Sequence, residues 1–360
     1  MSAEKVAVST AQQTTVLPQT HIAPDVACLR VAVLGAGGLG KGAAKILAKK
    51  QTIRLVAMCD SQGAVYDPRG LVLEAVANNR GNLVADYRRE APSSSTLVAD
   101  ITPDPIAAII EWADELDGIF IALPNMPNEF IPGIVKRVVS AKRGLVFSDV
   151  LKRTRAVEHM LALDGLVKDA QSVVLTGCGA TPGLLTAAAV LAAQSFIEVE
   201  RVDVWWGVGI ANWDAYKATI REDIAHVPGY SVERAKAMTD DEVDAFLAKT
   251  NGLLELHHME HADDILLERV GVVRSREQVE VGGVMDTRHA KKPVSTTMTL
   301  TGITYEGKRA SHRFILGDET TMAANVVGPA LGYLARGQWL KSRGLYGVFG
   351  CTEFLPMVVR

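Results

Sequence analysis

Residues 31–42, VAVLGAGGLGKG, place several glycines between an apolar run and a stretch with helical spacing. The spacing is G-x-G-x-x-G, in which the first glycine allows a tight turn, the second admits a diphosphate to the backbone, and the third lets a helix pack on a strand. The N–H groups at the start of the helix also favour an anion. The pattern predicts a dinucleotide pyrophosphate site. Its expected contacts are Gly35, Gly37, Gly38, Leu39 and Gly40.

A second strand pattern, IRLVAMCD, ends at Asp60, 20 residues after Gly40. A carboxylate at this position accepts hydrogen bonds from the ribose hydroxyls and repels the extra phosphate of NADP. We therefore expect NAD as the cofactor, with NADP as the alternative, and we include the adjacent Ser61 in the site. The competing interpretation is a glycine-rich turn that binds no nucleotide, beside a merely solvated Asp60.

Three more apolar runs end in residues suited to the same site: DGIFIALPN, GLVFSD and SVVLTG. Strands that alternate with helical runs predict an α/β fold with a parallel, doubly wound Rossmann sheet. Ligands of such sheets bind beyond the carboxyl ends of the strands. The cofactor contacts expected there are Leu123, Pro124, Asn125 and Cys178.

Hydride transfer to an imine or carbonyl also needs a proton donor and a substrate anchor in a dry pocket. Lys152, three residues after Asp149, is one candidate donor, and a surface lysine at the start of a helix is the equal alternative. The segment ANWDAYKATIREDIAHVPG provides more polar groups, although a solvated helix would have the same composition. Its candidate donors are Tyr216 and His226, and its candidate anchors are Lys217 and Arg221.

Two other patterns favour other chemistries less strongly. His257 and His261 have the i, i+4 spacing of metal ligands, but their segment lacks the HExxH order and we expect no metal. Cys178 at a strand end would suit the nucleophile of an aldehyde dehydrogenase, although small buried cysteines are common.

The chain has 360 residues, of which 48% are hydrophobic and 22% charged, and its net charge is −3. These values predict a soluble protein of about two domains with a small-molecule substrate and without a nucleic-acid or membrane partner. The charge-free run 170–197 contains TGCGATPG, which would break a membrane helix. The four cysteines are far apart, which fits reduced thiols and a cytoplasmic location.

The composition also divides the chain along its length. We expect a flexible leader over 1–27, a dinucleotide-binding domain over 28–197, a second α+β domain over 198–320, and a helix returning to the first domain over 321–360. Alternating apolar and polar residues after 198 predict a mostly antiparallel sheet. Because one face of that sheet needs a cover, we expect a homodimer through residues 199–320.

Four segments resemble the saccharopine dehydrogenase-like oxidoreductases: VLGAGGLGKGAAKIL, ALPN, GCGATPGLL and GDETTMAANVVGPALGYL. The resemblance covers about residues 30–360 and implies NAD(P)-dependent hydride transfer at the C–N bond, as imine or secondary amine, of an amino-acid or polyamine-type substrate. It places Thr181, Pro182 and Gly183 in the substrate cleft. Asp60 departs from the basic residue that several members carry there.

Two other functions fit the same residues. One is a carbonyl or sugar oxidoreductase of the Glu-Lys-Pro type with Lys152 in the role of the lysine, although DVLKRT lacks that tripeptide. The other is a non-catalytic dinucleotide sensor, in which the second domain serves only for association.

Overall fold

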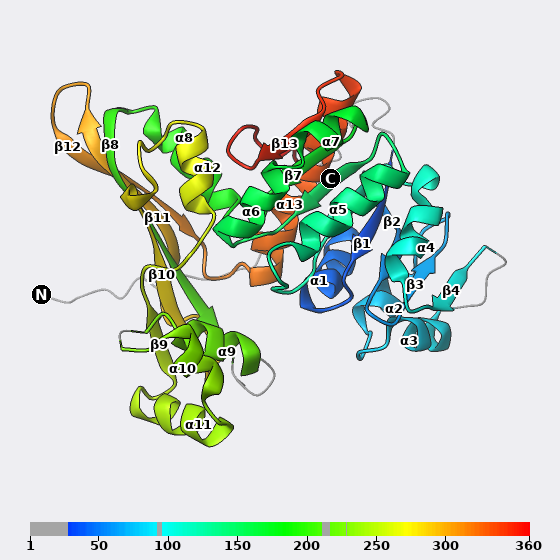
Figure 1. The fold of residues 1–360 in the computed structure, drawn as a ribbon, viewed down its shortest axis with the longest axis horizontal. Helices are drawn as coiled ribbons and strands as arrows, with labels where there is room; N and C mark the ends of the chain where they lie inside the picture. The colour runs from blue at the N-terminus through cyan, green and yellow to red at the C-terminus, as the bar shows by residue number, and fades with distance from the viewer. Residues whose placement is uncertain (1–27, 92–95, 211–216, 228) are drawn as a thin grey trace, which may run out of the picture.

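The structure is a computed structural model that describes residues 28–91, 96–210, 217–227 and 229–360. The described chain forms two sheets with helices packed on them (Figure 1). No helix among these residues is both long and apolar enough to cross a membrane.

The first sheet has eight strands in the order β13-β7-β6-β5-β1-β2-β3-β4. The strands from β13 to β2 are parallel, whereas β3 and β4 form an antiparallel edge. Their buried residues are almost all apolar, as expected for strands covered on both faces. The strands are β1 (Leu29–Leu34), β2 (Ile53–Cys59), β3 (Gly63–Tyr66), β4 (Val98–Ile101), β5 (Gly118–Ile121), β6 (Val146–Asp149), β7 (Val173–Thr176) and β13 (Gly347–Gly350).

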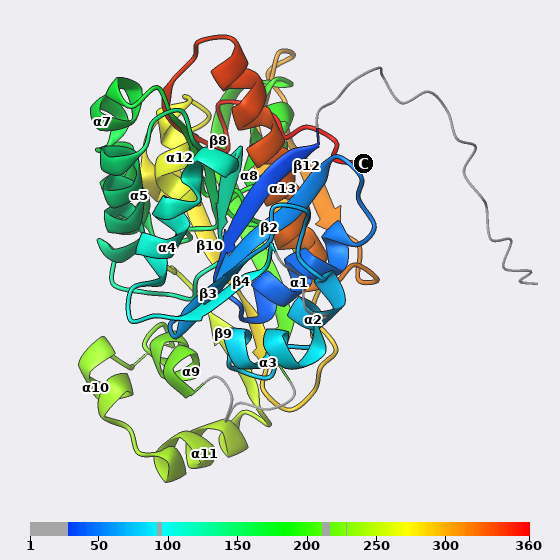
Figure 2. The same cartoon turned by 90° about the vertical axis from the view of Figure 1, so that its right-hand side faces the viewer.

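Helices cover both faces of this sheet, which confirms the predicted doubly wound fold (Figure 2). One apolar core lies between the sheet and α1 (Gly38–Leu47), α2 (Leu73–Ala77), α3 (Leu83–Glu90) and α13 (Met322–Ser342). The other core contains residues of α4 (Pro105–Glu111), α5 (Phe130–Ala141), α6 (Thr154–Leu161) and α7 (Asp164–Asp169), with the 3-10 turn η1 (Ala113–Glu115) beside them.

The second sheet has five strands in the order β12-β11-β8-β10-β9. Only β8 and β10 run parallel, so the predicted mostly antiparallel sheet is confirmed. Its strands are β8 (Phe196–Gly209), β9 (Leu253–Leu256), β10 (Val279–Asp286), β11 (Thr296–Thr304) and β12 (Arg309–Leu316), and the 3-10 turn η3 (Arg276–Gln278) precedes β10.

Two groups of helices cover different parts of the second sheet (Figure 1). One apolar core joins it to α8 (Leu184–Ala193) and α12 (Asp263–Arg269). The other joins it to α9 (Lys217–Ile224), α10 (Val232–Ala237) and α11 (Asp240–Lys249). Helix α8 therefore packs on the second sheet although it precedes residue 198, and the chain after α13 adds β13 to the edge of the first sheet.

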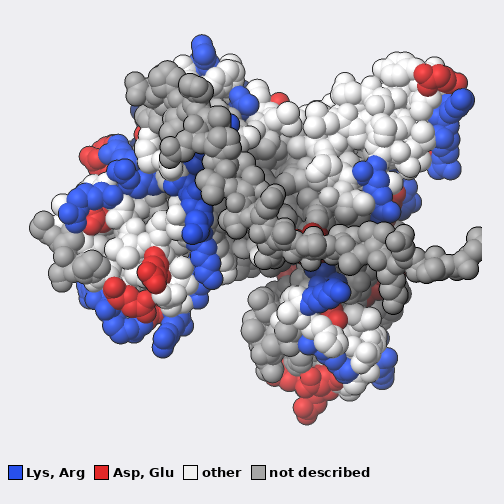
Figure 3. Space-filling view, turned by 180° about the vertical axis from the view of Figure 1, so that it is seen from behind, with Lys and Arg blue, Asp and Glu red and all other residues white. Residues whose placement is uncertain are grey.

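The rear face of the molecule carries basic and acidic side chains close together on both domains (Figure 3). Exposed ion pairs on the described part of the chain include Arg137 with Asp104 and Arg309 with Glu200. Exposed pairs of this kind contribute little to stability because water screens them.

Candidate active site

The glycine-rich turn after β1 needs two of its glycines for internal packing. Gly35 has φ +109°, and a Cβ there would lie 2.6 Å from the carbonyl oxygen of Ala122. A Cβ at Gly40 would lie 2.0 Å from the carbonyl oxygen of Gly35. Both contacts are far too short, so any side chain would force the turn, β5 and α1 apart.

Gly37 differs from these two glycines because a Cβ there would have no atom within 4 Å. Gly37 and Gly38 are exposed, and no side chain caps the start of α1. Open space in front of uncapped helix N–H groups is what a pyrophosphate requires. The turn therefore fits the predicted cofactor, with Gly37 kept small for a ligand rather than for the fold. Leu39, half-buried, packs against the core of the first domain.

Asp60 at the end of β2 makes three hydrogen bonds to backbone N–H groups. Its Oδ1 accepts from Gln62 at 2.8 Å and Gly63 at 3.0 Å, and its Oδ2 accepts from Leu83 at 2.8 Å. The carboxylate thus holds the turn into β3 and the start of α3, a role that sequence reasoning missed. Both lone pairs of Oδ1 are occupied by these bonds, whereas Oδ2 keeps a second lone pair for a ribose hydroxyl. Ser61 beside it is exposed.

In the first sheet β5 lies beside β1, and β6 lies beside β5. The ends of β5 and β6 are therefore near the glycine-rich turn that follows β1. The residues after the two strands line one small hollow, which is formed by Leu123, Pro124, Asn125, Leu151, Lys152 and Arg153 among others. The predicted cofactor contacts at the end of β5 and the predicted proton donor Lys152 are therefore neighbours. Cys178, after β7, is fully buried under this edge.

Asp149, the last residue of β6, is fully buried and holds three segments of this edge together. Its Oδ1 accepts from Leu151 N and Thr176 Oγ1 at 3.0 Å and from Gly177 N at 2.9 Å. Its Oδ2 has no partner among the described residues. Burial raises the pKa of Asp149 to about 6, although these hydrogen bonds act to lower it.

A cavity of about 330 Å³ lies between the two domains. Most of its wall is apolar, and its polar groups come from several elements of both domains. Apolar side chains in its wall include Trp206, Ile210, Ile220, Met259, Met285, Leu316 and Val326. Its polar side chains are Lys152, Thr181, Asp223, His261, Lys292, Thr296 and Asn325.

Lys152 and Asp223 face this cavity from different domains. Asp223 on α9 is 4% exposed, and burial raises its pKa to about 6, with the nearby Lys152 opposing that rise. Lys152 Nζ has no hydrogen-bond acceptor among the residues that the structure describes. Half-buried His226 lies near the same lysine, and burial lowers the pKa of its imidazole. An amine close to a buried carboxyl in an apolar pocket is suited to proton transfer.

The turn after β7 contributes Thr181 to the cavity, as predicted. Pro182 and Gly183 do not line it; they are buried and shape the turn. Gly183 has φ +132°, and a Cβ there would lie 1.9 Å from the carbonyl oxygen of Gly179. Its N–H donates to Thr186 Oγ1 at 2.8 Å, so this N–H is taken up internally.

The other candidates on and before α9 lie elsewhere. Arg221 donates to the carbonyl of Met238 at 3.0 Å and pairs with Asp240, and it does not line the cavity. Lys217 begins α9, but the structure describes only its backbone, and Tyr216 lies outside the described residues. Among the described side chains of α9, the polar one that lines the cavity is thus Asp223. The sequence pattern gave this residue no role.

The two candidate metal ligands of the histidine-rich segment, His257 and His261, have different surroundings. His257 pairs with Glu255 and packs against Trp205, whereas His261 is buried in the cavity wall and pairs with Asp263. The two histidines that share metal-ligand spacing therefore have separate partners. Burial distinguishes His261, and no local sequence signal marks it.

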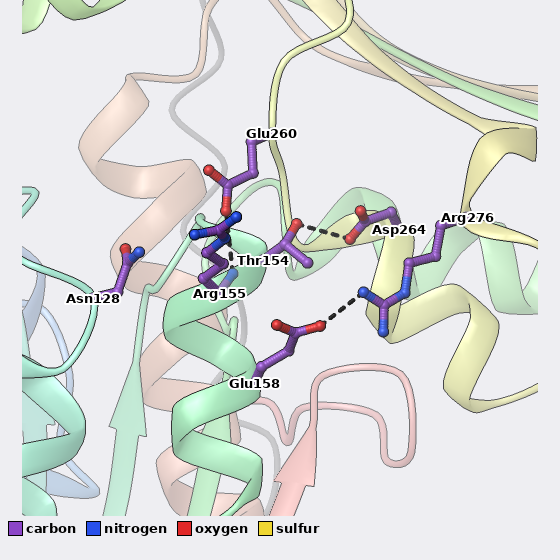
Figure 4. A pocket seen from close by; sticks show the side chains of 7 residues that line it. All are labelled: Asn128, Thr154, Arg155, Glu158, Glu260, Asp264 and Arg276. Carbon is purple, nitrogen blue, oxygen red and sulfur yellow. Dashed lines mark hydrogen bonds and ion pairs between the residues drawn. The ribbon is translucent and has the colours of Figure 1, made fainter. Parts of the chain in front are cut away.

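A larger polar hollow of about 570 Å³ lies between α6 and α12 (Figure 4). Arg276 pairs there with Glu158 and Glu268, and Thr154 donates to Asp264 at 2.9 Å. These contacts join the first domain to the second. Because the hollow is open and Arg276, Glu158 and Asp264 already bond to protein groups, it is a structural contact between domains rather than the candidate active site.

The fold and the cavity define a two-domain protein of the dinucleotide-dependent dehydrogenase architecture, with its candidate site between a Rossmann domain and a second sheet. Residues 7–109 match the family model for glutamate/leucine/phenylalanine/valine dehydrogenase. Diaminopimelate dehydrogenase of C. glutamicum, in complex with diaminopimelate, has the same fold (TM-score 0.52, 18% identity, 91% of this chain and 93% of that one). So does saccharopine dehydrogenase (L-Glu forming) of Saccharomyces cerevisiae (TM-score 0.55, 10% identity, 90% and 94%).

A curated relative is far more similar in sequence. The chain is 40% identical over 349 residues to the protein named (S)-8-amino-7-oxononanoate synthase BioU of Haloferax mediterranei, covering 91% of this chain and 99% of the relative. The chain therefore belongs to the BioU family. At 10% identity, the likeness to saccharopine dehydrogenase is one of fold.

Proposed function

We propose that this protein is a nicotinamide dinucleotide-dependent oxidoreductase that acts at the C–N bond of an amino-oxo carboxylic acid. One observation carries the proposal: Lys152 and Asp223 face one mostly apolar cavity, and Lys152 also lies beside the strand ends next to the glycine-rich turn. An apolar pocket with a few convergent polar groups is typical of an active site.

The cofactor part rests on the turn itself. The N–H groups at the start of α1 and the space at Gly37 suit the pyrophosphate, and the residues after β5 suit the nicotinamide half. When bound, the nicotinamide supplies a hydride acceptor or donor for the carbon attached to nitrogen. Lys152 and Asp223 line the cavity in which the charge on that nitrogen changes, and they stabilise that change electrostatically.

The substrate class rests on the name of the BioU relative and on the wall of the cavity. An 8-amino-7-oxononanoate has an amine and a ketone on neighbouring carbons, joined by methylene groups to a carboxylate. Trp206, Met259 and Met285 provide an apolar surface for methylene groups. The polar side chains of the same cavity suit the amine, the ketone and the carboxylate. We infer that the protein forms or consumes an acid of this class.

Binding and turnover test the proposal together. We expect NADH or NADPH to bind, with quenching of protein fluorescence, and nicotinamide absorbance at 340 nm to change when 8-amino-7-oxononanoate is added with ammonia or a primary amine. Gly37→Leu should abolish dinucleotide binding and leave the unfolding midpoint nearly unchanged, because no atom lies within 4 Å of the new Cβ. Gly133→Leu, at an exposed helix glycine that also has open space, is the matched control.

Two results would contradict the proposal. Absence of dinucleotide binding to the wild type would remove the cofactor. Tight binding without turnover of any amino-oxo acid or amine would instead support a non-catalytic sensor.

A further inference from the structure

His261 and Asp263 form a buried pair in the wall of the cavity. His261 Nδ1 lies 2.6 Å from Asp263 Oδ2, and the two side chains are 5% and 0% exposed. His261 lines the same cavity as Lys152 and Asp223. The backbone N–H of the next residue, Ala262, donates to the carbonyl oxygen of Lys152 at 2.8 Å. The imidazole is therefore held at a fixed position relative to the Lys152 segment.

The hydrogen bonds of Asp263 determine which nitrogen of His261 carries the proton. Asp263 Oδ2 also accepts from Thr181 Oγ1 at 2.7 Å, and Oδ1 accepts from Thr186 Oγ1 at 2.5 Å. Burial acts to raise the pKa of Asp263, but these three hydrogen bonds together hold it below its usual value. An ionised carboxylate only accepts, so Nδ1 of His261 must donate.

The proton on Nδ1 leaves Nε2 of the neutral ring as an acceptor. No partner for Nε2 occurs among the described residues, which distinguishes this atom from Nδ1. A buried imidazole with one nitrogen fixed by a carboxylate and the other open to a cavity is the arrangement of a proton acceptor.

We propose that His261 accepts and returns the proton of the substrate nitrogen, and that Asp263 is its positioning residue. In the oxidative direction an N–H bond of the substrate ammonium breaks, its electron pair stays on that nitrogen, and a new N–H bond forms at His261 Nε2. The carbon-bound hydrogen leaves as hydride to the oxidised nicotinamide. In the reductive direction the imidazolium returns its proton. This inference rests on the proposed function.

Several charged groups surround the pair and affect its titration. Lys152, Asp223 and Lys292 face His261 from the cavity. Burial raises the pKa of the nearby Cys351 thiol, and the negative charge of Asp263 raises it further. These groups also influence the pH dependence of kcat, so the effect of His261 is the difference between the profile of the wild type and those of its variants.

The kinetic experiment measures the pH dependence of kcat for amine oxidation in the wild type and in two variants. In the wild type kcat should fall at low pH as His261 becomes protonated, and we call this fall the acidic limb. His261→Asn should lower kcat about 100-fold or more and remove the acidic limb. Asp263→Asn should lower kcat and move that limb to lower pH, because the imidazolium loses its carboxylate. His258→Gln, at an exposed histidine paired with Glu280, is the control and should leave the profile unchanged. An unchanged acidic limb in both variants would overturn the proposal.

A measurement without turnover keeps the two proposals separate. In protein labelled with ¹⁵N-histidine, the ring-nitrogen shifts of His261 at pH 8.5 should show a protonated Nδ1 and an unprotonated Nε2, with assignment by His261→Asn. Asp263→Asn should change this tautomer. A wild-type ring protonated on Nε2 would overturn the inference whatever the substrate, whereas the expected tautomer without turnover would contradict only the proposed function.

Discussion

Arg153 at the start of α6 forms an ion pair with Glu222 of α9, so the two domains are joined directly beside Lys152 and Asp223. Asn125 Nδ2 lies 3.5 Å from the same glutamate, and Arg153 also donates to the carbonyl of Met126 at 3.3 Å. The side chains of the pair are 26% and 35% exposed. The contact therefore fixes the position of α9 over the strand ends from which the first domain contributes to the cavity.

Loss of this contact should weaken substrate binding more than catalysis. Glu222→Gln should raise KM about fivefold with a smaller change in kcat, because a partly exposed pair contributes about 1 kcal/mol. Steady-state kinetics check this. Glu242→Gln, which changes a carboxylate on α11 that caps its own helix, is the comparison and should leave KM unchanged.

We expect Asp60 to set the preference between NADH and NADPH. We predict tighter binding of NADH than of NADPH, with Asp60→Ala narrowing the difference in Kd. The same substitution should lower the unfolding midpoint, because it removes the acceptor of three backbone N–H groups. Titration calorimetry with both dinucleotides and a thermal scan measure the two effects. A wild type that prefers NADPH would contradict the assignment.

Lys292 should anchor the carboxylate of the substrate. It lines the cavity, and among the described residues its side chain makes one long hydrogen bond, from Nζ to the carbonyl oxygen of Thr320 at 3.5 Å. Lys292→Met should raise KM about tenfold or more and affect kcat less, since it removes a charge-assisted hydrogen bond made equally before and during reaction. The methyl ester of the substrate should be insensitive to the substitution. Lys291→Met, at the exposed neighbouring lysine, is the control.

Asp149 should make stability depend on pH in a defined direction. Its pKa is about 6 in the folded chain and near 3.8 in the unfolded chain, so the folded state holds more protons between these values. The contribution of Asp149 to stability is thus fully present below pH 4 and falls as the pH rises to about 6.

Asp149→Asn removes this titration and keeps an oxygen for the three donors. Its free energy of unfolding, relative to the wild type, should therefore improve by roughly 2 kcal/mol between pH 4.5 and pH 7.5. Denaturant unfolding at the two pH values tests this. A difference that stays constant with pH would show that Asp149 titrates normally.

We also predict that the protein forms a homodimer through residues 199–320. Strand β12 is an edge strand, and Phe314 and Ile315 on it are 41% and 55% exposed. The surface around the β11 and β12 hairpin is mostly uncharged away from its tip (Figure 3). Light scattering should give twice the chain mass, and Ile315→Lys should reduce it to one chain. Ile101→Lys, at the exposed edge of the first sheet, should not. A monomeric wild type at micromolar concentration would contradict the prediction.

The sequence by itself determined the features that depend on local backbone geometry. The spacing of Gly35, Gly37 and Gly40 predicts both the turn and its ligand, because each glycine acts within a few residues of its neighbours. The alternation of apolar strands with helices likewise predicts the first sheet, and the alternation of apolar and polar residues after 198 predicts the second. Lys152 could be proposed as a site residue because it follows a strand end, and such ends meet at one edge of a parallel sheet. Thr181 is proposed from the resemblance to a known family.

The tertiary structure decided the features that depend on residues far apart in the chain. Lys152 faces the same cavity as Asp223, and Thr186 bonds to Asp263, only when segments far apart in the chain pack together, and local periodicity contains no information on those contacts. The uniform apolar residues of α8 cannot indicate which sheet it covers. The hydrogen bond from Leu83 N to Asp60 likewise forms only when the start of α3 reaches the end of β2, whereas the bonds from Gln62 and Gly63 are local. Long-range packing therefore decides which polar residues are buried together, and burial is what turns His261 and Asp263 into candidates for chemistry.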